Sequence, residues 1–166
     1  MLYFDCIRRD SMCDENELLK KAVTYIMSLV AKREYSISDL TNKLMSKYEN
    51  QIVDSAINYA IEHNYVSDER YSEMFVRYRA NNYYGPKKIY YELKLKRINE
   101  NIISSAIENC GISFEERAKE YFDRKFADSD LNDRKLKEKA YRSMINRGYT
   151  NEQVNFCFIT MDSHQE

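Results

Sequence analysis

Apolar residues recur every three or four positions along most of the chain, a spacing typical of amphipathic helices. Asp14 and Glu15 suit a helix start, and the pattern behind them predicts a first helix over residues 14–33. A second helix follows, with Ser36 or Ser38 as its N-cap. A third helix spans residues 51–63, with core positions at Val53, Ala56, Ile57, Ala60 and Ile61.

The succession of three helices then begins again twice. A Pro in the first turn or a residue suited to N-capping marks most of the later helix starts: Ser67, Gly85 with Pro86, Asn99, Ser113 and Thr150. Two further stretches need separate mention. Residues 134–146 form an eighth helix, preceded by a polar loop over residues 128–133. On the fourth helix we expect Tyr71, Phe75 and Tyr78 to form the apolar face.

Two sets of core positions repeat at nearly constant offsets. Val53-Ala56-Ile57, Ile103-Ala106-Ile107 and Val154-Cys157-Phe158 recur at offsets of 50 and 51 residues. The pairs Leu40-Leu44, Ile89-Leu93 and Ala140-Met144 recur at offsets of 49 and 51. Any amphipathic helices can be aligned to some degree, but two independent series favour a tandem array of three-helix repeats.

This reading divides the chain into segments. Residues 1–13 lack a helical period and are expected to be an irregular arm. The first repeat spans residues 14–66, the second 67–111 and the third 112–162, as one continuous array. One Pro and three Gly among 166 residues fit an all-α fold.

Cysteine usage and hydropathy narrow the class of protein. The four cysteines form no C-x-x-C pair and only two His are present, so we expect neither a metal site nor a cofactor. Cys110 and Cys157 fall at apolar positions and are expected to be buried, while Cys6 and Cys13 lie in the arm. Without a signal peptide or an 18-residue apolar run, the expected location is the cytoplasm.

Charge is distributed unevenly although the net charge is only −1. Residues 67–98 hold 8 basic and 4 acidic side chains, whereas both flanking regions carry an excess of acid. Between Arg77 and Arg97 there are seven basic residues and one acid, Glu92, with Tyr83, Tyr84, Tyr90 and Tyr91 interleaved. Basic side chains beside aromatic ones suit phosphate contact and base stacking, and they suit an acidic protein surface equally well.

The fifth helix start departs from the usual rule. Helix N-termini favour Asp or Glu, yet this one carries Lys87 and Lys88. Together with exposed backbone N–H groups, these lysines would form an anion site. With Ile89 and Leu93 facing the core, Lys87, Tyr91 and Lys94 form an outward stripe at spacing i, i+4, i+7. The alternative is a pair of tolerated surface lysines.

A second basic run occupies the eighth helix and includes Arg134, Lys135 and Arg142. It would extend the first run into one positive groove, or it is an ordinary solvated helix face. The nine candidate contact residues for protein or DNA are therefore Arg77, Lys87, Lys88, Tyr91, Lys94, Arg97, Arg134, Lys135 and Arg142. No nucleophile elbow, phosphate loop or paired His and carboxylate motif appears, so we expect no catalytic residues and no enzyme activity.

Several segments, taken in order, resemble the bacterial regulatory protein RecX family. Residues 85–93 (GPKKIYYEL) resemble its G-P-x-[KR]-I-x-x-E-L signature, and residues 33–40 resemble its R-x-x-S-x-x-E-L, with Asp39 in place of Glu. Residues 65–71 resemble Y-[LI]-[DN]-[DE]-x-[RK]-[FY], departing at Ser67, and residues 147–149 match R-G-[FY]. The resemblance covers roughly residues 18–160.

The resemblance implies an elongated, curved array of three tandem three-helix repeats. It also implies binding of a monomer to the RecA recombinase filament on single-stranded DNA, where the protein restrains filament growth, ATP hydrolysis and strand exchange. The residues alone leave a second hypothesis open, a stand-alone nucleic-acid-binding module that does not depend on recombinase. A third reading is an inert scaffold.

Overall fold

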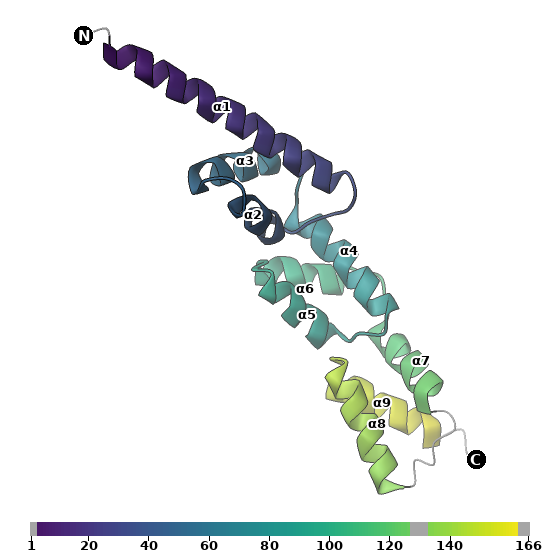
Figure 1. Ribbon diagram of the computed structural model, residues 1–166. Coiled ribbons are helices and arrows are strands. Elements are labelled where there is room, and N and C mark those ends of the chain that lie inside the picture. Colours follow the sequence, from purple (N-terminus) through teal and green to yellow (C-terminus); the bar gives the residue numbers. More distant parts are fainter. Residues whose placement is uncertain (1–2, 127–132, 163–166) are drawn as a thin grey trace. The chain divides into compact units, whose positions relative to one another are not determined.

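The computed structural model describes residues 3–126 and 133–162, with side chains from residue 14 to 126 and from 133 to 159. Every regular element in these ranges is an α-helix, which confirms the predicted all-α fold (Figure 1). The chain divides into two units, Met1–Tyr71 and Ser72–Glu166, and the helix α4 (Asp68–Asn81) contributes residues to both. Among the described residues, none of the helices has the length and hydropathy that crossing a membrane requires.

The first unit is built from three helices: α1 (Tyr3–Val30), α2 (Ile37–Met45) and α3 (Asn50–Glu62). Both α1 and α2 pack against α3, and the side chains between them are fully or almost fully buried. Ser36 caps α2 by accepting a hydrogen bond from the Asp39 backbone N–H at 3.1 Å. The expected N-cap is thus confirmed, and the core is an apolar cluster that includes Ala22, Ile26, Leu40, Leu44, Val53, Ala56 and Ala60.

The N-terminal boundary differs from our expectation. The helix α1 begins at Tyr3, so residues 3–13 are helical rather than irregular. This stretch contains neither Gly nor Pro, and nothing in it prevents the first helix from extending backward. The absence of a regular apolar period indicates only that these residues have no continuous core-facing stripe.

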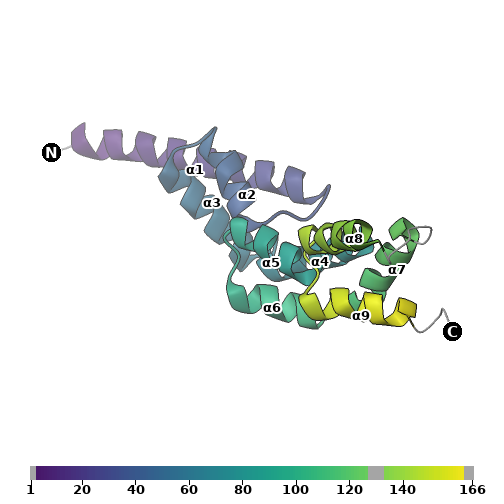
Figure 2. The same cartoon turned by 90° about the horizontal axis from the view of Figure 1, so that it is seen from below.

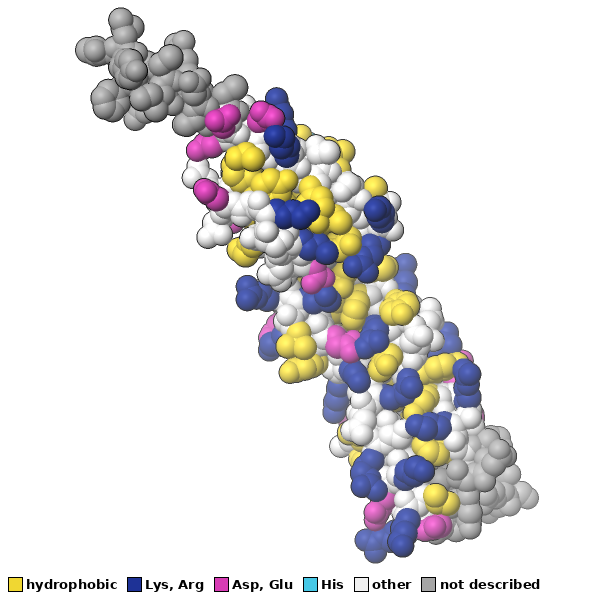
Figure 3. Space-filling view, viewed as in Figure 1, with side chains coloured by type: hydrophobic (Ala, Val, Ile, Leu, Met, Phe, Trp, Pro, Cys, Tyr) yellow, Lys and Arg dark blue, Asp and Glu magenta, His cyan; other side chains and the backbone are white. Residues whose placement is uncertain are grey.

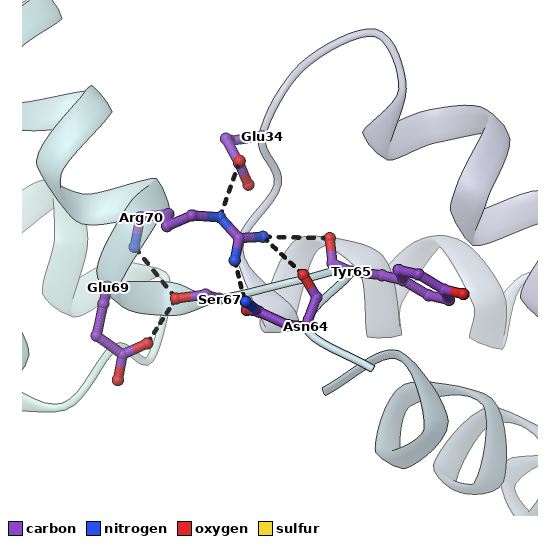
Figure 4. A network of polar contacts seen from close by, with 6 residues as sticks. All are labelled: Glu34, Asn64, Tyr65, Ser67, Glu69 and Arg70. Carbon is purple, nitrogen blue, oxygen red and sulfur yellow. Dashed lines mark hydrogen bonds and ion pairs between the residues drawn. The ribbon is translucent and has the colours of Figure 1, made fainter. Parts of the chain in front are cut away.

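A polar network joins the end of α3 to the start of α4 (Figure 4). The Arg70 guanidinium donates to the Glu34 carboxylate at 3.1 Å and to the backbone carbonyls of Asn64 and Tyr65 at 3.2 and 3.4 Å. Asn64 follows α3 with a left-handed φ of 55°, a conformation common at helix ends. Ser67 caps α4 by accepting from the Arg70 N–H at 3.2 Å. The Arg70 side chain therefore satisfies backbone carbonyls that the end of α3 leaves without a helical partner.

The second unit continues from α4 with five more described helices. In Figure 2, α6 and α9 lie along one edge of this unit. The contacts pair α5 with α6 and α8 with α9, and α7 packs on both members of the second pair. The bounds are α5 (Pro86–Leu95), α6 (Glu100–Glu108), α7 (Phe114–Phe126), α8 (Arg134–Asn146) and α9 (Asn151–Asp162).

The predicted repeat is confirmed at the level of core positions. The three pairs Leu40-Leu44, Ile89-Leu93 and Ala140-Met144 occupy α2, α5 and α8, and all six side chains are fully buried. Their equivalents one helix later, on α3, α6 and α9, are also buried at Val53, Ile103 and Val154. The same helix face thus meets the core in each repeat, which is what a tandem three-helix array requires.

Several predicted core side chains are less buried than expected. Tyr71 on α4 is buried as predicted, but Tyr78 is 62% exposed, because α4 also buries Ser72, Val76 and Ala80 on the adjoining face. Ile61 is 43% exposed, and Cys110 is only half-buried, whereas Cys157 is buried as predicted. A spacing of three or four residues shows which side chains share a helix face. It does not show which face packs best, because small side chains on a neighbouring face let the helices approach more closely than large ones do.

The start of α5 lies against the end of α8 through two glycines. The Gly85 N–H donates to the Arg147 carbonyl at 2.8 Å, and the Lys87 N–H donates to the Gly148 carbonyl at 3.0 Å. A Cβ on Gly85 would lie 2.3 Å from the Gly148 carbonyl carbon, and a Cβ on Gly148 would lie 2.3 Å from the Lys88 Cβ. We call this contact the glycine junction, and only glycines fit it.

A first prediction concerns this junction. Gly148→Ala should lower the free energy of unfolding by roughly 3–5 kcal/mol, since it adds a backbone clash to the strain of a side chain at φ +89°. Gly111→Ala is the matched control, because Gly111 has φ +70° but its Cβ would meet no described atom within 4 Å. There the cost should be about 1–2 kcal/mol. Chemical denaturation of the full chain measures both, and equal losses would contradict the junction.

A second prediction concerns the network around Arg70. Arg70→Lys should lower the free energy of unfolding by roughly 1–2 kcal/mol, because an ammonium group cannot reproduce the branched set of hydrogen bonds. The control is Arg77→Lys, since Arg77 is 59% exposed and lies 3.9 Å from its one ion-pair partner among the described residues, Glu73. We expect the control to stay within about 0.5 kcal/mol of the parent. A loss no larger at Arg70 than at Arg77 would mean that the network contributes little.

Candidate partner-binding surface

The helix α5 presents a cationic and aromatic stripe to solvent. Ile89 and Leu93 are fully buried and fix the rotation of the helix, so Lys87, Tyr91 and Lys94 all lie exposed on its other side. The exposed fraction of Tyr91 is 61%, and Leu95 one turn later is 66% exposed. The structure therefore brings three of the nine predicted contact residues onto one helix face, and we call them the α5 stripe.

The α5 stripe differs in its charge pairing from one end to the other. The Lys94 Nζ lies 2.6 Å from the Glu100 Oε1, and this hydrogen bond raises the pKa of Lys94. Both side chains are more than half exposed, so the pair remains open to solvent and is weak. Lys87 has no ion-pair partner among the described residues. Lys87 is thus the member of the stripe whose charge is fully available to a partner.

The predicted anion site at the start of α5 is not present in the form expected. The N–H groups of Gly85 and Lys87 already donate to the Arg147 and Gly148 carbonyls. Because the third repeat satisfies these donors, they cannot also hold a phosphate or carboxylate. The two lysines are present, but the prediction that these backbone N–H groups contribute to anion binding is wrong.

Lys88 belongs to the glycine junction rather than to the α5 stripe. Its side chain is half-buried, and the Nζ lies 3.5 Å from the Asn146 carbonyl oxygen and 5.0 Å from the centroid of the Tyr84 ring. Positive charge at the carboxyl end of α8 complements the dipole of that helix. Lys88 therefore has a structural role that its sequence position did not reveal.

Tyr84 is the centre of a cationic cluster that sequence reasoning missed. The guanidinium carbon of Arg79 lies 3.9 Å from the Tyr84 ring centroid, and that of Arg147 lies 5.0 Å away. Arg79 also forms a double hydrogen bond with Glu92, the one acid in the basic segment. Arg147 donates to the backbone carbonyls of Asn82 and Tyr83 at 2.9 and 3.3 Å. These contacts hold the α4–α5 turn against α8.

The remaining candidates on α4 and α5 are exposed singly. Arg77 lies 3.9 Å from Glu73 one turn earlier, and both side chains are more than half exposed. Arg97 is exposed and adopts a left-handed φ of 60° directly after α5. Both can reach a partner, but nothing in the described contacts orients them toward the α5 stripe.

The basic run on α8 is also exposed. Arg134 is 91% exposed and lies 3.1 Å from Glu138, while the Arg142 Nε donates to the Glu138 carbonyl at 3.3 Å. Lys135 is exposed near the same end. The glycine junction follows the carboxyl end of α8, and Arg134 lies at the other end of this helix, about 18 Å away along its axis. Figure 3 shows Lys and Arg side chains interspersed with apolar ones over this helix.

The exposed features of this surface suit binding. In the described part of the chain, His, Cys, Asp and Glu side chains do not gather in groups of three as a metal site requires. Burial raises the pKa of the Cys157 thiol to about 11, which disfavours the reactive thiolate. The exposed features are ammonium groups beside aromatic and aliphatic side chains, and these can contact phosphates, bases or an acidic protein surface.

A third prediction tests the charge at the start of α5. Lys87→Glu should raise the free energy of unfolding by about 0.3–1 kcal/mol, because it replaces an unfavourable charge at a helix N-terminus by a favourable one. Lys87→Gln should give a smaller gain of the same sign. Denaturant unfolding at low salt measures both, and a loss of stability would show that Lys87 has a structural role that the contacts do not reveal.

Comparison with known proteins identifies close relatives in sequence. The family model described as "RecX, second three-helix domain" matches residues 67–107, which begin where our predicted second repeat begins. "Regulatory protein RecX" of Actinobacillus pleuropneumoniae serotype 5b (strain L20) is 38% identical over 135 residues, covering 81% of this chain and 88% of its own length. The protein of that name from Haemophilus ducreyi is 39% identical with the same coverage. These relatives are named as regulators rather than as enzymes.

Solved structures show the same fold. The crystal structure of RecX from Lactobacillus salivarius matches with a TM-score of 0.77 at 19% identity, covering 89% of this chain and 98% of that one. A second crystal structure, of regulatory protein RecX, matches with a TM-score of 0.77 at 18% identity over 90% of this chain. At this level of identity the likeness concerns the arrangement of helices.

Proposed function

The chain belongs to the RecX family of regulatory proteins, and on that premise we propose that it regulates RecA by binding RecA filaments on single-stranded DNA. Bound there, it restrains filament extension, ATP hydrolysis and strand exchange. It acts as a monomer without a cofactor and without an activity of its own. The filament is assembled on DNA, so the proposed location is the cytoplasm.

The observation that carries this proposal is the α5 stripe. Lys87 and Tyr91 are exposed, and Lys87 has no carboxylate partner among the described residues. A surface of this kind suits the acidic groups of a protein partner or the phosphates of the DNA that the filament encloses. The basic residues of α8 would add long-range attraction, because exposed charges steer association even where they do not touch the partner.

A fourth prediction tests the α5 stripe against RecA. Increasing amounts of the wild-type protein, below the RecA concentration, should inhibit the ATPase of RecA on single-stranded DNA. The double variant Lys87→Glu/Lys94→Glu should require roughly tenfold more protein or greater for half-inhibition, since two attractions become repulsions. The control is Lys20→Glu/Arg124→Glu, which changes the net charge equally at two exposed positions outside the proposed surface.

The outcomes separate the proposal from its rivals. Absence of inhibition by the wild-type protein would eliminate RecA regulation through ATP hydrolysis. Equal weakening by both double variants would show a general effect of net charge rather than a specific surface. An inert scaffold predicts that neither variant changes any binding.

A second candidate is a nucleic-acid-binding module that does not depend on RecA. The exposed Tyr91 ring between two lysines favours it, because such a ring can stack on a base while the lysines contact phosphates. This reading predicts binding to bare single-stranded DNA with affinity that falls steeply as salt rises, whether or not RecA is present. Fluorescence anisotropy of a labelled oligonucleotide at two salt concentrations measures it.

A further inference from the structure

A groove lies beside the α5 stripe, between α5, α6 and the start of α9. Its volume is about 350 Å³ and most of its lining is apolar. The lining residues come from these three places in the second unit: Pro86, Lys87 and Tyr90; Ser104, Ile107 and Glu108; and Thr150. Lys87 belongs both to this groove and to the α5 stripe, so a partner that contacts Lys87 also reaches the groove.

The walls of the groove are fixed before any partner arrives. Ile89 on α5 and Ile103 on α6 are fully buried, and the two helices pack against each other. The α5 end of the groove is held by the glycine junction, through the Lys87 N–H and the Gly148 carbonyl. Thr150 is held by the hydrogen bond from its N–H to the Gln153 side chain at 3.0 Å. Binding to a preformed pocket loses little free energy, because few side chains have to be ordered.

The volume of the groove indicates the size of its occupant. About 350 Å³ is near the lower end of the range for small-ligand sites, which suits one large side chain with its flanking backbone. The apolar lining by Pro86, Tyr90 and Ile107 favours an aromatic or large aliphatic group. In protein interfaces, such a buried anchor supplies much of the binding free energy.

The two charged lining residues select the class of partner. Among the described residues, neither Lys87 nor Glu108 has an ion-pair partner. Lys87 therefore attracts a carboxylate next to the apolar anchor. Glu108 lies on the other helix of the groove, so a single carboxylate can pair with Lys87, whereas a continuous line of phosphates would also meet the repulsion of Glu108.

We propose that this groove binds one large apolar side chain of a partner polypeptide, with a neighbouring carboxylate of that polypeptide paired to Lys87. The identity of the partner as RecA rests on the proposed function. The chemistry of the groove does not, and it can be tested with peptides alone. On this reading the α5 stripe steers the approach and the groove retains the partner.

The first experiment fills the groove. Ser104→Trp places an indole in the groove, while Ser105→Trp makes the same change one residue later at an exposed position that does not line it. The natural chain contains no Trp, so each variant also reports its own environment by fluorescence. Binding to RecA filaments on single-stranded DNA should weaken at least tenfold in Ser104→Trp and less than twofold in Ser105→Trp.

These outcomes distinguish the two proposals. If Ser104→Trp folds and binds filaments as the wild type does, the groove proposal is overturned while RecA regulation stands. If the wild type does not bind filaments, the proposal of RecA regulation is wrong. The peptide experiment below then decides whether the groove binds an apolar side chain next to a carboxylate. Far-ultraviolet circular dichroism and thermal unfolding check that both variants keep the fold.

The second experiment needs no filament. Acetyl-Gly-Phe-Asp-amide and acetyl-Gly-Phe-Lys-amide are titrated into the isotope-labelled full chain, and amide chemical shifts are followed by NMR. The Asp peptide should shift the signals of Ser104 and Ile107 and bind at least threefold more tightly than the Lys peptide. In the Lys87→Glu variant this preference should reverse, because both charged lining residues are then acidic.

Absence of shifts at α6 with either peptide, or a preference that Lys87→Glu leaves unchanged, would overturn the proposal. Shifts that follow both peptides equally would show an apolar pocket without the carboxylate recognition that we infer. A single-stranded oligonucleotide that shifts the same α6 signals more strongly than the peptides would assign the groove to nucleic acid instead.

Discussion

The close approach of Gly85 to Gly148 is the constraint from which the second unit takes its form. Two backbone hydrogen bonds, from Gly85 to Arg147 and from Lys87 to Gly148, replace the side-chain cap that α5 lacks. They join the second repeat to the third at a distance that no Cβ permits. Because this contact fixes the first residue of α5, it also sets the direction of the α5 stripe and one end of the groove.

The family signature over residues 85–93 can now be understood physically. Its fixed positions are mostly structural: Gly85 forms the junction, Ile89 and Leu93 fill the core, and Glu92 pairs with Arg79. The positions that the signature leaves open are Lys87, Tyr90 and Tyr91, and these line the groove or form the stripe. A match to such a signature therefore identifies the fold, and the side chains that we propose as partner contacts stand at positions that the signature does not specify.

The sequence was sufficient to predict the features that depend on the spacing of nearby residues. Helix α8 has the predicted bounds, Ser36 is one of the two predicted caps, and Ile89 and Leu93 are the predicted core pair. It was insufficient to predict contacts with a segment far away along the chain. The donors at the start of α5 looked free because their acceptors lie some sixty residues later, at Arg147 and Gly148. Tyr78 looked buried because spacing cannot show that α4 packs through smaller residues.

The basic side chains around the start of α5 differ in whether other groups of the chain compensate their charge. This difference indicates which of them is available to bind a partner. Arg79 has Glu92 and the Tyr84 ring, Arg147 has the carbonyls of Asn82 and Tyr83, and Lys88 has the end of α8. Each of these three stabilises the fold where it stands, so the fold alone accounts for its presence. Lys87 has no such contact among the described residues and lies where the helix dipole disfavours it. Since none of the described residues compensates the charge of Lys87, we propose that the compensating group belongs to a partner outside the chain.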